Sequence, residues 1–338
     1  MLLSLLISFA QTPAPDATLV APPLDHVILI SVDGLRSDAL LINGGDGLPN
    51  FQRLRYGAHT LNARTDPHYS VTLPNHADML TGRLVKGDGG HGWTSNATPP
   101  PEGVLADAEG GVFQGIYHQT SAAGIDDAFL ASKPKFFLFT QSWNPTYDLR
   151  VMDVVLVKDD VEAQMDLVFQ MLDEEQHERS FTFLHLRGPD DAGHGHGWDM
   201  TPGSPYLKAV QDADKQIGRI LTFLDEHKAL RATTAIVVTA DHGGGIPHKN
   251  HHGHGMLWVN TVIPFFIDLP QNKKVDLYEL CATTRRDPGL DPVANDADKL
   301  PPIRSADVAN LCLALLGLDS IPGSTVNVSQ DLSRALFQ

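Results

Sequence analysis

The sequence predicts a single α/β domain, a three-layer sandwich in which a central, mostly parallel β-sheet carries helices on both faces. Short apolar runs of strand length alternate with stretches of helical periodicity along the 338 residues. Polar residues that can bind ligands follow several of these runs, where the carboxyl ends of parallel strands form a crevice. A composition of 42% hydrophobic and 20% charged residues is sufficient for one domain with a deep core.

Six short segments are predicted to be strands. The first, residues 26–32, is nearly continuous, as expected for a strand that is buried on both faces of a parallel sheet. The others are residues 114–118, 136–140, 181–185, 235–239 and 263–267. Helices are predicted between or after them at residues 72–80, 161–172, 206–227 and 305–316, with Asp160 and Ser204 as N-caps of the second and third.

The formal net charge of −16 argues against polyanionic partners. Such a surface repels nucleic-acid polymers, so we expect a small-molecule substrate. Several of the 16 histidines stand in tight groups beside Asp and Gly, which favours metal binding. Neither Cys281 nor Cys312 lies in a motif, so neither is given a catalytic role, and their pairing stays open.

The first 23 residues are predicted to be a signal peptide and a Pro/Ala-rich leader. Residues 1–11 include a short apolar run that looks like the h-region of a signal peptide, although no basic residues precede it. We therefore expect export to the periplasm or the extracellular space; the alternative is a disordered tail. No later apolar run reaches the roughly 18 residues of a membrane span, so stable membrane insertion is not expected. Residues 24–338 then form the single catalytic domain.

Candidate metal ligands follow three of the predicted strands. Asp33 follows the first strand, Asp190 and His194 follow the fourth, and Asp241 and His242 follow the fifth. Because ligands bind outside the carboxyl ends of strands in open α/β sheets, these side chains are expected to converge. This convergence is a stronger indication than any single motif.

Each of these groups also has a structural interpretation. Asp33 alone would be assigned to a helix cap, and residues 187–197 could be a polar surface loop in which Asp191 and His196 are spare candidates. An Asp and a His four residues apart, among glycines that let the backbone fold closely around a centre, favour a metal.

A further histidine is expected to complete the ligand set. Three glycines follow Asp241 and His242, and the segment Asn-His-His-Gly-His-Gly at residues 250–255 comes next. His252 and His254 are preferred because each is followed by Gly. Imidazole and carboxylate ligands shared between two sites suit Zn²⁺, with two ions per chain, and Mn²⁺ or Fe remains an alternative.

Thr72 is the candidate nucleophile. It precedes Pro74 near the start of a predicted helix, where Pro is tolerated and where backbone N–H groups favour a bound anion. A hydroxyl bound to a metal is more easily deprotonated and becomes nucleophilic. Asn75 could donate its amide to a phosphoryl oxygen. The alternatives are an N-cap role for Thr72 and a turn or capping role for Asn75.

Taken in order, these motifs resemble the alkaline phosphatase superfamily in its type I phosphodiesterase/nucleotide pyrophosphatase branch. The matching segments are residues 32–34, 72–76, 80–83, 190–194 and 241–244, with a C-terminal part at 309–324 that looks like bacterial sulfatase-like hydrolases of this branch. The resemblance implies an alkaline phosphatase-like fold. It also implies metal-dependent hydrolysis of phosphate esters, with phosphodiester or pyrophosphate bonds preferred over monoesters.

The resemblance also implies roles for individual residues. One zinc ion would be bound by Asp33, Thr72, Asp241 and His242. The other would be bound by Asp190, His194 and a final histidine, for which the distance to residues 263–265 favours His252 over His254. Thr72 would attack phosphorus and form a phosphothreonine that water hydrolyses, while Asn75 would hold a phosphoryl oxygen.

Several alternatives remain open at this point. The same site could act on a phosphomonoester, a phosphonate or a sulfate ester, but no Cys/Ser-x-Pro-x-Arg motif surrounds Thr72, which makes a sulfatase the weaker interpretation. A catalytically inactive metal-binding homologue is the alternative outside enzymes. His91 and Trp93 lie in a Gly-rich segment that is expected to face the substrate, and a packed loop fits this segment equally well.

Overall fold

A computed structural model describes residues 23–98, 103–106, 111–145, 150–173, 177–253 and 255–337. Their centre is an eight-stranded sheet with the order β4-β3-β5-β1-β6-β7-β2-β8. The strands are β1 (His26–Val32), β2 (Ala58–Arg64), β3 (Asp126–Ala131), β4 (Val154–Val157), β5 (Ser180–Leu186), β6 (Thr234–Thr239), β7 (Val262–Asp268) and β8 (Val275–Asp276). All neighbouring pairs are parallel except those that β7 forms with β6 and β2.

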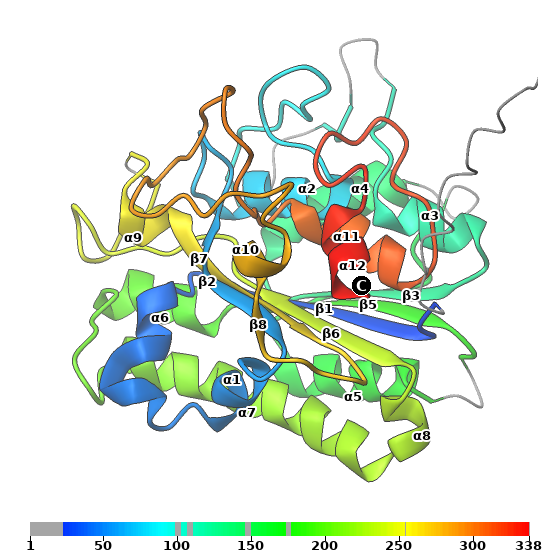
Figure 1. Ribbon diagram of the computed structural model, residues 1–338, viewed down its shortest axis with the longest axis horizontal. Coiled ribbons are helices and arrows are strands. Elements are labelled where there is room, and N and C mark those ends of the chain that lie inside the picture. Colours follow the sequence, from blue (N-terminus) through cyan, green and yellow to red (C-terminus); the bar gives the residue numbers. More distant parts are fainter. Residues whose placement is uncertain are drawn as a thin grey trace, which may run out of the picture.

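Helices cover both faces of this sheet, which confirms the three-layer α/β fold (Figure 1). The layer below the sheet in Figure 1 includes α1 (Pro49–Leu54), α5 (Val161–Met171), α7 (Pro205–Glu226) and α8 (Lys228–Arg231). The layer above includes α2 (Thr72–Thr81), α3 (Ile116–Ala122), α4 (Phe137–Trp143), α11 (Asp307–Leu315) and α12 (Asp331–Leu336). The remaining helices are η1 (Ser37–Gly45), η2 (Pro134–Phe136), α6 (Gly188–His196), α9 (Trp258–Thr261) and α10 (Leu277–Leu280).

The core is built around β1, all of whose residues are buried. The long helix α7 covers the lower face with an apolar stripe that includes Leu207, Val210 and Ile217, at the spacing of a helix that packs on a sheet. Each fully buried Val, Leu or Ile side chain contributes about 1.5–3 kcal/mol. Ser204 caps α7 by accepting a hydrogen bond from Leu207 N at 3.2 Å, as the sequence predicts. Asp160 caps α5 in the same way.

Two of the six predicted strands are wrong, because residues 114–118 and 136–140 lie mainly in helices α3 and α4. Their apolar side chains pack on the sheet from one face. Tyr117 lies edge-on to Phe181, with ring centroids 5.5 Å apart, and Phe136 lies 6.0 Å from Phe129. A short apolar run does not distinguish a buried helix from a strand, and Pro134 begins the helical segment. The strands β2, β3, β4 and β8 were not predicted.

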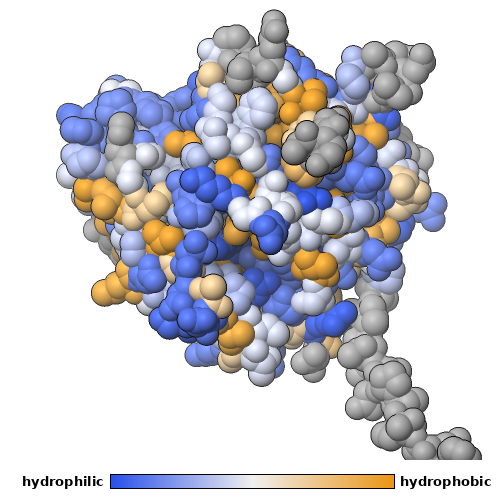
Figure 2. All heavy atoms as spheres, turned by 90° about the horizontal axis from the view of Figure 1, so that it is seen from above, coloured by the Kyte–Doolittle hydropathy of each residue, from blue (hydrophilic) through white to orange (hydrophobic). Residues whose placement is uncertain are grey.

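The surface seen from above Figure 1 has apolar residues in small separate groups among polar ones (Figure 2). Among the described residues, no helix is both long and apolar enough to span a membrane. Cys281 and Cys312 are both buried and are not joined in a disulfide. The predicted signal peptide falls on residues 1–22, which lie outside the described part of the chain, and on Pro23.

Candidate metal centre

The predicted ligands converge at the carboxyl ends of three adjacent strands. Asp33 follows β1, Asp190 lies in α6 just after β5, and Asp241 follows β6. Gly34 allows the chain after β1 to approach α6 closely, since its φ is +72° and a Cβ there would lie 2.8 Å from Cα of Asp190. This close approach brings Asp190 next to Asp33, and Asp241 joins them because β6 is the neighbour of β1 in the sheet.

An inner triad consists of Asp33, Asp241 and His242. All three side chains have no solvent exposure, and one ligand atom from each lies within 4.8 Å of the others. His242 Nε2 is 3.4 Å from Asp33 Oδ1 and 3.3 Å from Asp241 Oδ2. Two carboxylate oxygens and one imidazole nitrogen are a donor set that suits Zn²⁺.

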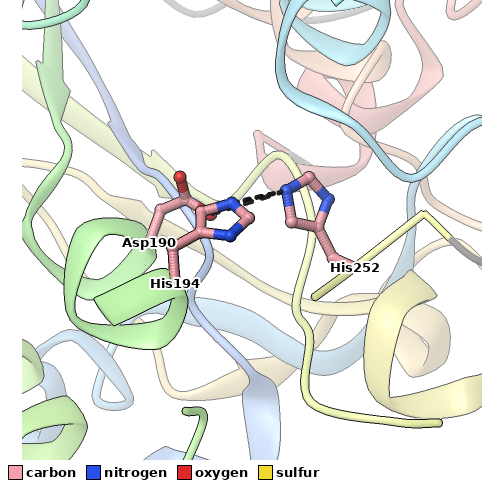
Figure 3. A group of neighbouring side chains, drawn as sticks. All are labelled: Asp190, His194 and His252. Atoms are coloured by element: carbon pink, nitrogen blue, oxygen red, sulfur yellow. Dashed lines mark hydrogen bonds and ion pairs between the residues drawn. The ribbon is translucent and has the colours of Figure 1, made fainter. Parts of the chain in front are cut away.

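An outer triad consists of Asp190, His194 and His252 (Figure 3). The ring nitrogens His194 Nε2 and His252 Nε2 are 3.1 Å apart and lie 3.5 and 3.7 Å from Asp190 Oδ1. Asp190 and His194 come from successive turns of α6, and His252 reaches them from the opposite loop (Figure 3). The side chain of His194 is 43% exposed, whereas that of His252 is 6% exposed.

The two triads adjoin each other. The rings of His242 and His252 are stacked with centroids 3.8 Å apart, and His242 Nε2 is 3.9 Å from Asp190 Oδ1. The geometry therefore offers two neighbouring sites rather than two separate ones, as expected for a pair of ions that act on one substrate.

Backbone carbonyls fix the tautomers of the three histidines. The Nδ1 atoms of His194, His242 and His252 contact the carbonyl oxygens of Asn250, Gly243 and Ser70 at 2.9–3.0 Å. A carbonyl only accepts hydrogen bonds, so each Nδ1 carries a proton and each ring turns its Nε2 toward its triad. Burial lowers the pKa of His242, and burial with the adjacent His242 lowers the pKa of His252 to about 3, which favours the neutral rings.

The arrangement of the carboxylate oxygens also fits a bound cation. Asp33 Oδ1, Asp190 Oδ1 and Asp241 Oδ2 are buried and have no hydrogen-bond partner. Buried carboxylate oxygens without partners are costly, and here they face the unprotonated nitrogens of the histidines. A set of electron-pair donors that lacks protons fits divalent metal ions, and Zn²⁺ accepts both donor types.

A buried lysine and histidine hold the opposite oxygen of Asp33. Lys133 Nζ and His185 Nε2 lie 2.6 and 2.8 Å from Asp33 Oδ2, and Lys133 also pairs with Asp190. Burial alone raises the pKa of Asp33, but the charge of Lys133 and the hydrogen bond from His185 outweigh it and hold the pKa well below its usual range. Burial and the charge of Asp33 raise the pKa of Asp241 well above its usual range. One lysine does not neutralise three carboxylates, so further positive charge would stabilise this centre.

Thr72 lies beside the inner triad. It is the first residue of α2, is 1% exposed, and its Oγ1 is 3.4 Å from His242 Nε2. Val71 before it is extended and Pro74 occupies the first turn, where a missing N–H costs nothing. The hydroxyl therefore stands both at the metal site and at a helix N-terminus that favours anions.

Asn75 is not aimed at the centre. Its side-chain oxygen accepts a hydrogen bond from Asp66 N at 2.8 Å, and its amide nitrogen donates to the carbonyls of Tyr69 and Val71 at 2.9 and 3.0 Å. The amide thus holds the loop before α2 against that helix. Its assignment to a phosphoryl oxygen stays a prediction that this geometry does not favour.

Asn96, which no sequence motif marks as a site residue, contacts the start of α2. Its side-chain oxygen accepts hydrogen bonds from Leu73 N at 3.0 Å and from Lys135 Nζ at 3.1 Å. These contacts place its amide next to the residue after Thr72. Lys135 and Lys133 follow β3 and were missed as well, because a lone Lys carries no sequence signal for a site.

His91 and Trp93 form contacts within their own loop and with α2. His91 is 3% exposed, with Nε2 2.7 Å from Asp78 Oδ1, and its Nδ1 accepts a hydrogen bond from Trp93 N. The Trp93 indole donates to Ser95 O at 2.9 Å. These contacts are those of a packed loop that carries Asn96. His254 lies outside the described residues, so of the two candidates for the last ligand only His252 can be placed.

The sequence profile of the type I phosphodiesterase/nucleotide pyrophosphatase family matches residues 27–264. The chain belongs to this family. It is a phosphoric ester hydrolase, and the match spans both triads and Thr72. A sequence comparison with curated proteins gives no match.

Solved structures show the same fold. Murine ectonucleotide pyrophosphatase/phosphodiesterase 5 has 17% identity and a TM-score of 0.59, with 88% of this chain and 96% of that chain covered. An inactive variant of that mouse enzyme, in complex with AMP, matches equally well. The lipoteichoic acid synthase LtaP from Listeria monocytogenes has 15% identity and a TM-score of 0.60, with 92% and 76% covered. At these identities the likeness establishes an alkaline phosphatase-like fold.

Proposed function

We propose that this enzyme hydrolyses phosphodiester or pyrophosphate bonds of small molecules through a covalent phosphothreonine at Thr72, in a centre that holds two zinc ions. The observation that carries the proposal is the position of Thr72 Oγ1, at the start of α2 and 3.4 Å from His242 Nε2 in the inner triad. The three buried carboxylate oxygens without partners support the two-metal assignment. Mn²⁺ and Fe are the alternatives that metal analysis tests.

The residues divide between the two ions as the triads do. Asp33, Asp241, His242 and Thr72 would hold one ion, and Asp190, His194 and His252 would hold the other. When bound, such ions lower the pKa of a coordinated hydroxyl and neutralise charge on the phosphoryl group. Thr72 Oγ attacks phosphorus, the bond to the leaving group breaks, and water then hydrolyses the phosphothreonine and restores the hydroxyl.

The protein supplies the anion site around the phosphoryl group. Leading N–H groups of α2 have no carbonyl partner within the helix and lie next to Thr72. Asn96 has its side-chain oxygen turned to Leu73 N and Lys135 Nζ, which leaves its amide protons for a phosphoryl oxygen. Donors that are fixed before the reaction stabilise charge as it develops, without a cost of reorganisation.

A second candidate function is phosphomonoester hydrolysis. Lys135 Nζ lies at the amide of Asn96, and Lys133 lies between Asp33 and Asp190. A monoester carries one more charged oxygen than a diester. Lys133 is paired with the two carboxylates, so Lys135 beside Asn96 is the lysine that would favour that extra charge. Replacement of Lys135 therefore tests phosphomonoester hydrolysis against phosphodiester hydrolysis.

The test is turnover of bis(p-nitrophenyl) phosphate and p-nitrophenyl phosphate by the zinc-loaded enzyme. Thr72→Ala is expected to lose roughly 10⁴–10⁶-fold in kcat on either ester, as other enzymes do without their nucleophile. Faster diester cleavage supports the phosphodiesterase assignment; monoester preference that Lys135→Ala abolishes supports the second candidate. Activity that survives in Thr72→Ala would show that the nucleophile is elsewhere, and bound zinc without turnover on any ester would indicate an inactive homologue.

We also infer that residues 24–338 act as one catalytic domain and that residues 1–23 direct export. The support is the single sheet that crosses the described chain from β1 to β8, and the apolar run at residues 1–11. Expression of the full chain with separation of the secreted and cellular fractions tests this. A secreted form whose N-terminus lies near residue 23 is expected; an uncleaved protein that stays in the cell would contradict it.

A further inference from the structure

We propose that Trp198 is a positioning residue that holds the outer triad in its binding arrangement before a metal ion arrives. This inference rests on the metal centre of the proposed function. Trp198 follows α6 directly and is 4% exposed. The structure ties its indole to every segment that supplies the outer triad.

Glycines form the slot that receives the indole. A Cβ on Gly193 would lie 2.4 Å from indole atom Cε2, and a Cβ on Gly244 would lie 2.5 Å from the same atom. Neither distance is sterically tolerable. Gly193 lies in α6 beside His194, and Gly244 lies in the turn after His242. The glycines of the two metal motifs are therefore required here by the ring that packs on them.

Two hydrogen bonds fix Trp198 to further parts of the centre. The indole Nε1 donates to Gly34 O at 2.9 Å, in the turn after Asp33. The backbone N donates to Lys249 O at 2.9 Å, at the start of the loop that carries His252. Trp198 thus connects the end of β1, α6 and this loop.

The indole also contacts both histidines of the outer triad. Its ring lies 5.2 Å from that of His194 and 5.8 Å from that of His252, edge-to-face in both cases. The Nε2 atoms of the two rings lie 3.1 Å apart, so the arrangement of the outer triad depends on the orientation of both rings. Since His194 is 43% exposed, it is free to turn into solvent unless the indole and the Asn250 carbonyl retain it.

The inner triad does not depend on this support in the same way. Asp241 Oδ1 accepts hydrogen bonds from Gly34 N and His242 N, and Asp33 Oδ2 contacts Lys133 and His185. The Tyr206 hydroxyl also donates to Gly34 O at 3.0 Å, so Gly34 and the inner side chains remain held without the indole. Loss of the indole should therefore weaken one metal site and leave the other intact.

The experiment is a zinc titration of the metal-free full chain against a competing chromophoric chelator, with metal content measured separately. Trp198→Leu is expected to bind one zinc ion about tenfold more weakly than wild type, because residues that contact metal ligands affect affinity on this scale. Its affinity for the second ion should be unchanged. Trp198→Phe keeps a ring edge beside His194 and should fall in between. At saturating zinc the kcat of both variants should return to the wild-type value.

Trp143→Phe is the matched control. Trp143 is also buried and also donates an indole hydrogen bond, to Phe113 O at 3.0 Å, but its ring packs on Tyr117 and Phe139. It should lose stability without a change in either zinc affinity. Trp198 variants in which both zinc affinities are unchanged, or both are weakened equally, would overturn the inference. If Trp198→Leu does not fold, the zinc affinities of Trp198→Phe provide the test. A wild-type chain that binds no zinc would instead refute the metal centre of the proposed function.

Discussion

Replacing Asp241 with Asn is expected to change stability in opposite directions without and with metal. Asp241 Oδ1 accepts hydrogen bonds from Gly34 N and His242 N, while Oδ2 is buried without a partner, 3.3 Å from His242 Nε2. In Asp241→Asn the amide oxygen can keep the two N–H contacts, and the amide nitrogen can donate to the lone pair of His242. The metal-free protein gains a hydrogen bond at a carboxyl group whose charged form is disfavoured by burial and by the charge of Asp33, which raise its pKa.

The size of both effects follows from general values. Relief of an unsatisfied buried polar group is worth about 1–3 kcal/mol. A chain of 338 residues has an unfolding entropy of about 0.7 kcal/mol per kelvin near 60 °C, so the metal-free Tm should rise by about 1–4 °C. An ion present at 1,000 times its Kd stabilises the folded state by about 4.1 kcal/mol, or about 6 °C per site. Asp241→Asn should lose the rise in Tm that comes from the ion at the inner triad.

Thermal unfolding followed by circular dichroism, in chelator and in excess zinc, measures both values. Asp191→Asn is the control, because Asp191 is on α6 next to Asp190 but pairs with Arg187 at the surface. It should show the zinc-dependent rise of the wild type. A metal-free Asp241→Asn protein that is less stable than wild type, or one that keeps the full rise with zinc, would refute the reasoning.

Three further predictions concern residues around the centre and remote from it. His185→Gln should keep zinc affinity near the wild-type value, because an amide can donate to Asp33 as the ring does, whereas His185→Phe should weaken it about 10–100-fold; competition with a chelator measures both. Burial raises the pKa of Asp127 to about 8. The folded state then binds its proton more tightly than the unfolded state, so wild type should lose stability as pH rises from about 4 to about 8, and Asp127→Asn should remove that loss in urea midpoints measured at pH 5 and pH 8. Ser204→Ala should cost about 1 kcal/mol in urea unfolding through loss of the N-cap of α7, with an unchanged m-value.

The sequence predicted the part of the fold whose signals are local. The run at residues 26–32 is β1 to the residue, because a strand between two parallel neighbours must be apolar on both faces. The N-caps at Asp160 and Ser204 were correct for the same reason, since a cap depends on a few neighbouring residues. The failures at 114–118 and 136–140 came from short segments whose length and composition fit both a strand and a buried helix.

The three candidate carboxylate ligands could be anticipated because each follows a recognisable strand. The topology brings those strand ends together in any open parallel sheet, so Asp33, Asp190 and Asp241 needed no structure to be associated. Lys133, His185 and Asn96 could not be found in this way. Their roles depend on contacts between residues 39–152 positions apart in sequence, such as the 2.8 Å contact from His185 to Asp33.

The unequal exposure of the two triads has a consequence for metal exchange. The inner ligands have no solvent exposure and lie behind the stacked ring of His252, whereas His194 in the outer triad is 43% exposed. An ion at the outer triad should therefore leave first when a chelator is added, and the inner ion should follow slowly because its side-chain ligands are buried. Stopped-flow mixing of the zinc-loaded enzyme with a chromophoric chelator should show two phases of equal amplitude. His194→Ala should lose the fast phase and keep the slow one, while release in a single phase from the wild type would contradict the ordering of the two sites.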